Sequence, residues 1–116
     1  MDGSRIAFIG ASIGANVALA YAAGLNADVK TVVLLSPGEE YRGVNTVVPA
    51  KSYGKPAFYV ASDRDAYAAK SVKKLAELAG NAAETKIYKG EEHGTNLLGR
   101  GHGLEELIYE WLKKHL

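Results

Sequence analysis

At 116 residues, of which 47% are hydrophobic and 23% charged, the chain fits one domain over residues 1–116 with a single hydrophobic core. The formal net charge is +1 with scattered basic residues, which excludes a nucleic-acid-binding surface, and no apolar run is long enough to span a membrane. The chain has no cysteine and no signal-peptide pattern, so disulfides and thiolate chemistry are excluded and a cytoplasmic protein is expected.

Apolar runs and helical patterns then alternate along the chain. Runs typical of buried strands occupy residues 5–9, 31–35, 57–61 and 85–88, and helical patterns occupy residues 13–23, 66–79 and 104–116. Gly24 is expected to end the first helix, and the segment 36–55 to be irregular apart from one helical turn after Pro49. This order predicts an α/β fold of three layers, with four parallel strands and helices on both faces.

Three reactive residue types follow the predicted strands. Ser12 follows the first strand, Asp63 and Asp65 follow the third, and His93 follows the fourth. Because the carboxyl ends of parallel strands meet at one edge of a sheet, these side chains could come together there. A serine hydroxyl becomes a good nucleophile when an imidazole accepts its proton and a carboxylate orients that imidazole. Either aspartate could supply the carboxylate.

The turn around Ser12 has the composition that such a nucleophile requires. A tight strand-to-helix turn forces the serine into strained dihedral angles and projects its side chain away from the sheet. Gly10 and Gly14 are expected to let the strand and the helix approach closely. The N–H of Ile13, at the start of the helix, is the natural donor to an oxyanion.

The motif Gly10-Ala11-Ser12-Ile13-Gly14, between an apolar strand and an Ala-rich helix, resembles the nucleophile elbow of the α/β-hydrolases. The dienelactone-hydrolase-like carboxylesterase branch is the most similar. Further matching stretches are Leu35-Ser36-Pro37-Gly38, Val60-Ala61-Ser62-Asp63-Arg64-Asp65 and Glu92-His93-Gly94.

The resemblance covers nearly the whole chain, but only the C-terminal half of the family's fold, as a truncated α/β-hydrolase-like domain. It implies a serine esterase for small esters, with Ser12 as nucleophile, Asp65 as acid and His93 as base. Asp65 is preferred to Asp63 because the family spacing of Ser-x-x-Asp begins at Ser62. No metal and no organic cofactor are implied.

Other interpretations of these residues are weaker. The sequence from Gly10 to Ala15 is close to a dinucleotide-binding turn, but Ser12 stands where a glycine must admit the pyrophosphate, and no acidic residue ends the second strand. Asp65 could also cap the following helix. His102 lies between two glycines and is expected to shape the start of the last helix, and His115 suits the negative end of that helix.

The half of the fold that the resemblance leaves out normally supplies a second oxyanion N–H. Losing one such donor lowers the rate by about 10²–10³, or about 3–4 kcal/mol, so we expect slow turnover of short-chain esters. The first strand would be a sheet edge and one helix layer would lose its neighbour, which predicts a homodimer that covers this edge or the bared helix face. The alternative is a weak or inactive hydrolase fragment that acts as a dimeric folding or binding module.

Overall fold

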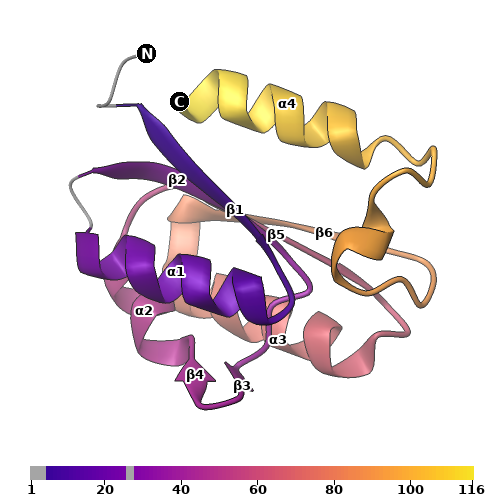
Figure 1. Cartoon of the computed structure of the whole chain (residues 1–116), viewed down its shortest axis with the longest axis horizontal. Coiled ribbons are helices and arrows are strands. Elements are labelled where there is room, and N and C mark those ends of the chain that lie inside the picture. Colours follow the sequence, from indigo (N-terminus) through magenta and orange to yellow (C-terminus); the bar gives the residue numbers. More distant parts are fainter. Residues whose placement is uncertain (1–4, 26–27) are drawn as a thin grey trace.

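The computed structural model describes residues 5–25 and 28–116, which form a four-stranded parallel sheet with helices on both faces (Figure 1). The strands lie in the order β1-β2-β5-β6. The sheet is made of β1 (Ile6–Ala11), β2 (Val29–Leu35), β5 (Ala57–Ser62) and β6 (Ala83–Tyr88). The helices are α1 (Ile13–Leu25), α2 (Val47–Tyr53), α3 (Ala66–Ala79) and α4 (Leu104–His115), with single 3₁₀ turns η1 (Gly80–Ala82) and η2 (Gly94–Leu97).

The two central strands, β2 and β5, are buried on both faces, as their apolar sequences predict. All six residues of β5 are buried, and in β2 Lys30 is the single exposed residue. The edge strands β1 and β6 are half-buried to exposed for most of their length. The carboxyl ends of all four strands point the same way, because every pairing in this sheet is parallel.

The helices divide unequally between the two faces of the sheet. Helices α1, α2 and α3 cover one face, whereas α4 and η2 cover the other (Figure 1). On the α4 face, Trp111 stacks on Phe58 with ring centroids 5.4 Å apart and donates an indole hydrogen bond to the Thr31 hydroxyl. That hydroxyl donates in turn to the carbonyl of Pro56. These contacts anchor α4 to the centre of the sheet.

Several predicted boundaries differ from the structure. Strand β1 ends at Ala11 and not at residue 9, and β2 and β6 each begin two residues earlier than expected. Gly24 does not end the first helix, since α1 continues to Leu25 and Gly24 keeps a negative φ. The segment 36–55 is more regular than expected, with the short antiparallel pair β3 (Glu40–Tyr41) and β4 (Val44–Asn45) followed by α2. Pro49 lies inside the first turn of α2, where a missing N–H removes no intrahelical hydrogen bond.

Within the described ranges, no helix combines the length and the hydropathy needed to cross a membrane.

Candidate active site

Ser12 occupies a strained turn between β1 and α1. Its φ of 57° lies in the left-handed region, which non-glycine residues adopt only when the surrounding structure holds them there. The Ser12 N–H donates to the carbonyl of Leu35 at 2.9 Å, and the Ser12 carbonyl accepts from the N–H of Ala15 at 3.0 Å. These bonds join the turn to the end of β2 and to the first turn of α1, so the backbone of Ser12 is fixed from both sides.

The two glycines of this turn are not equivalent. A Cβ atom at Gly10 would lie 2.5 Å from the carbonyl oxygen of Gly14 and 2.8 Å from the Cα atom of Ala15, so β1 and α1 approach too closely for any side chain there. A Cβ atom at Gly14 would meet nothing within 4 Å. The expectation that both glycines permit the close approach is therefore correct for Gly10 and wrong for Gly14.

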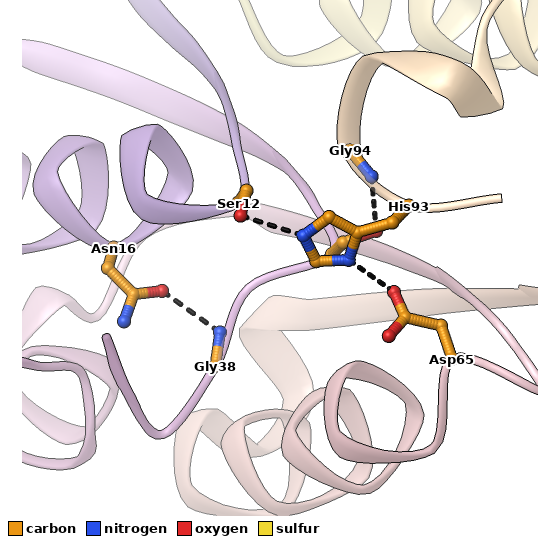
Figure 2. Close-up of polar contacts among 7 residues, drawn as sticks. Ser12, Asn16, Gly38, Asp65, His93 and Gly94 are labelled. Atoms are coloured by element: carbon orange, nitrogen blue, oxygen red, sulfur yellow. Dashed lines mark hydrogen bonds and ion pairs between the residues drawn. The ribbon is translucent and has the colours of Figure 1, made fainter. Parts of the chain in front are cut away.

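Ser12, His93 and Asp65 form a continuous chain of hydrogen bonds (Figure 2). His93 Nε2 lies 2.7 Å from Ser12 Oγ, and His93 Nδ1 lies 2.5 Å from Asp65 Oδ2. A carboxylate accepts only, so we assign the Nδ1–H tautomer to His93, with Nε2 accepting from the serine hydroxyl. The three residues follow β1, β5 and β6, and the parallel sheet brings them together at one edge.

The two aspartates after β5 have different partners. Asp65 stands at the N-cap position of α3, but its side chain makes no capping hydrogen bond and points to His93 instead (Figure 2). Asp63 accepts from the backbone N–H of Gly90 at 2.9 Å, and so it ties the end of β5 to the loop after β6. The geometry thus distinguishes the two aspartates, which residue type alone left open.

The other histidines lie outside this hydrogen-bond chain. His102 Nε2 is 2.9 Å from the carbonyl of Leu97, and its ring stacks on Tyr88 with centroids 3.8 Å apart. His115 is the last residue of α4 and packs on Trp111. Both positions agree with structural roles at the two ends of α4.

Ser36 holds the backbone next to His93, and sequence reasoning did not single it out. Its side chain is fully buried, its φ is 54°, and its hydroxyl accepts a 2.8 Å hydrogen bond from the N–H of Gly94, the residue after His93. Gly94 itself has a φ of 61° and lies against Ser12. A serine directly after a buried strand, as in Leu35-Ser36, was the one signal in the sequence.

Asn16 and two tyrosines hold the loop that borders the site. The Asn16 amide is fully buried; its oxygen accepts from the N–H of Gly38 at 3.0 Å (Figure 2), and its nitrogen donates to the carbonyl of Val44. Tyr41 and Tyr67 pack on Gly38 with no room for a Cβ atom. The Tyr41 ring meets the His93 ring edge-on, with centroids 6.3 Å apart.

The surroundings of Tyr41 favour its neutral phenol. Burial is the largest of the effects that raise the pKa of Tyr41 above its ordinary value, followed by the charge of Asp65 and by Tyr67. A neutral phenol beside the Asp65–His93 pair adds no second negative charge to it.

Comparison with known proteins identifies the fold. No protein-family model and no curated protein matches the sequence. Among solved structures, the crystal structure of the Bacillus cereus carboxylesterase matches 98% of this chain with a TM-score of 0.66 and 26% sequence identity. The chain has a partial α/β-hydrolase fold. It spans 51% of the length of that carboxylesterase, so about half of the larger structure has no counterpart here.

In this partial α/β-hydrolase fold, the surroundings of Ser12 are open to solvent. The described residues enclose no pocket, and they contain no cluster of His, Asp and Glu that could hold a metal ion. The His93 side chain is 41% exposed and that of Asp65 is 17% exposed. Ile13 is the first residue of α1, and its N–H lies where an α-helix has no intrahelical acceptor.

Proposed function

We propose that this chain is a serine esterase that cleaves small carboxylic esters through an acyl-enzyme intermediate. The observation that carries the proposal is the hydrogen-bond chain from Ser12 through His93 to Asp65, with Ser12 at a positive φ between a strand and a helix. The similarity to a carboxylesterase structure supports a hydrolase of this kind. The reaction and the roles below are our assignments.

In the acylation half, the Ser12 Oγ attacks the ester carbonyl carbon while its proton passes to His93 Nε2. The new C–O bond converts the carbonyl into a tetrahedral oxyanion. Asp65 holds the ring by accepting from Nδ1–H and stabilises the imidazolium that forms. Collapse of the tetrahedral species breaks the bond to the alcohol, which takes the proton from His93 Nε2 as it leaves.

In the deacylation half, the same histidine activates water. His93 Nε2 accepts a proton from a water molecule, whose oxygen attacks the acyl carbon and forms a second tetrahedral oxyanion. Release of the carboxylic acid returns the proton to Ser12 Oγ. His93 therefore acts as the base in both half-reactions, because it is the imidazole that is hydrogen-bonded to Ser12.

We assign the Ile13 N–H as an oxyanion donor. It follows the nucleophile directly and belongs to the N-terminus of α1, where the helix dipole favours negative charge. A hole with this one donor would stabilise the oxyanion less than a pair of donors, by about 3–4 kcal/mol. We therefore expect measurable turnover of activated esters and hardly any of amides.

The open surroundings favour small acyl groups. With no enclosed pocket among the described residues, a long acyl chain would gain little from burial near Ser12. The Tyr41 ring lies edge-on beside His93 and offers an aromatic surface next to the triad. We expect acetyl and butyryl esters to be better substrates than long-chain esters.

The test is turnover of p-nitrophenyl acetate together with labelling by a fluorophosphonate probe. Wild-type protein should hydrolyse the ester and take up the probe, and Ser12→Ala should do neither. Asp65→Asn should lower turnover by a factor on the order of 10⁴, because the amide favours the wrong tautomer of His93. The matched control is Ser52→Ala, an exposed serine on α2, which should behave as wild type. Wild-type turnover that survives in Ser12→Ala would refute the proposal.

A further inference from the structure

The edge strand β1 leaves one side of the sheet without a partner strand. In the described sheet β1 pairs with β2 alone, so one row of its N–H and C=O groups faces outward. Two of its apolar side chains are also uncovered, Ile6 at 37% and Ile9 at 54% exposed. The strand carries no charged residue and no proline, the usual means by which an edge strand avoids pairing.

The helix that follows β1 is apolar on its outer side as well. Helix α1 buries Ala15, Leu19 and Ala22 against the sheet, yet Val17 is 48% and Tyr21 is 59% exposed. A helix that is apolar all round is normally buried on all sides. By contrast, the outer sides of α3 and α4 carry lysines and glutamates. Helix α1 thus has the composition of an internal helix.

These two surfaces adjoin at the sheet edge; together we call them the β1–α1 face and define it by Ile6, Ile9, Val17 and Tyr21. Ile6 lies on the α1 side of the sheet, as Phe8 does, and Ile9 lies on the α4 side, as Ala11 does. The ring of Tyr21 lies 5.9 Å from that of Phe8 on β1, so the exposed side of α1 adjoins the sheet edge. From Ile6 to Leu25 the sequence contains no Asp, Glu, Lys, Arg or His. The face therefore offers apolar side chains and free backbone groups, with no charge within it.

We propose that the β1–α1 face binds a second copy of this chain. A two-fold axis perpendicular to the sheet would pair β1 with the partner's β1 in antiparallel fashion and satisfy the outward backbone groups of both. The same axis keeps both α1 helices on one side of the joined sheet and lets their outer sides meet. In an interface with this symmetry, each side chain close to the axis lies near the same side chain of the second copy. An uncharged face is suited to this, since it brings no like charges together.

Light scattering after gel filtration at about 50 µM tests the proposal. Wild-type protein should have twice the 12.3 kDa mass of the chain. Ile9→Lys and Val17→Lys should each give the monomer mass, because a two-fold axis would bring two new lysines into the interface. Both positions are half exposed, so both variants should keep the wild-type circular dichroism spectrum.

The matched control is Val48→Lys on α2, which is 69% exposed and lies outside the β1–α1 face. It should remain a dimer. Four results would overturn the proposal: a monomeric wild type, a dimer that persists in both lysine variants, equal dissociation by Val48→Lys, or open-ended assembly beyond two copies. A monomeric wild type that binds an apolar dye, with binding lost in Ile9→Lys, would instead assign the face to a different polypeptide.

The outcome is independent of the proposed esterase activity, because the masses are measured without substrate. Fluorophosphonate labelling of Ser12 in the same samples reports on the catalytic proposal separately.

Discussion

The two glycines of the Ser12 turn allow a matched test of the packing between β1 and α1. An alanine at either position adds one methyl group to the same turn. In Gly10→Ala the added carbon meets backbone atoms at 2.5 Å and 2.8 Å, and backbone cannot rotate out of the way as a flexible side chain would. Overpacking of this kind destabilises by about 1–3 kcal/mol. We expect Gly10→Ala to lie at the upper end of that range.

Gly14→Ala should have the opposite effect on stability. The new methyl group meets nothing within 4 Å, and Gly14 lies in the first turn of α1 at an ordinary negative φ. Alanine restricts the unfolded chain and favours the helix, so the variant should be more stable by about 0.5–1 kcal/mol. The two variants should then differ by about 2–4 kcal/mol, although the elbow motif treats their glycines alike.

Urea unfolding followed by far-ultraviolet circular dichroism measures this difference. With a urea dependence of about 2 kcal/mol per molar, the two midpoints should be about 1–2 M apart, with Gly14→Ala the higher. Repeating the titration at two protein concentrations separates folding from self-association. Equal midpoints, or a lower midpoint for Gly14→Ala, would contradict the close contact that we describe at Gly10.

Three further predictions concern single side chains. Ser12→Gly should have a free energy of unfolding about 1 kcal/mol higher than that of Ser12→Ala in urea titrations, because only glycine relieves the strain at a φ of 57°. Ser36→Ala should cost about 1–3 kcal/mol by urea unfolding and slow fluorophosphonate labelling, because it leaves the Gly94 N–H without its acceptor. Burial raises the pKa of Tyr59 from 10 to about 12, so its contribution to stability is complete below pH 10 and is lost as the pH rises to 12. Wild-type protein should lose about 2 kcal/mol more than Tyr59→Phe between pH 10 and pH 12 in urea titrations at each pH.

The sequence predicted the sheet and the set of strand ends because those features depend on burial and chain order. The runs that became β2 and β5 are apolar on both faces, and only central strands need such sequences. With the order of parallel strands given, Ser12, Asp65 and His93 had to follow strands at one edge. The partial α/β-hydrolase fold confirms the predicted sheet and its covering helices.

The finer features could not be predicted because they depend on contacts between residues far apart in sequence. The hydrogen bond between Ser36 and Gly94 spans 58 residues, and nothing in either local sequence indicates the other partner. The division of roles between Asp63 and Asp65 depends on how the loop after β6 folds. The pair β3 and β4 has no apolar periodicity, since each strand has only two residues.

The stacking of Trp111 on Phe58 makes the chain its own spectroscopic probe. Trp111 is the one tryptophan in the sequence, and it lies on the α4 face of the sheet, remote in sequence from the turn at Ser12. Its emission therefore responds to the docking of α4, whereas the covalent capture of Ser12 that we propose would require the assembled strand ends. Following both signals during refolding would time the docking of α4 and the assembly of the strand ends separately, in an unmodified chain.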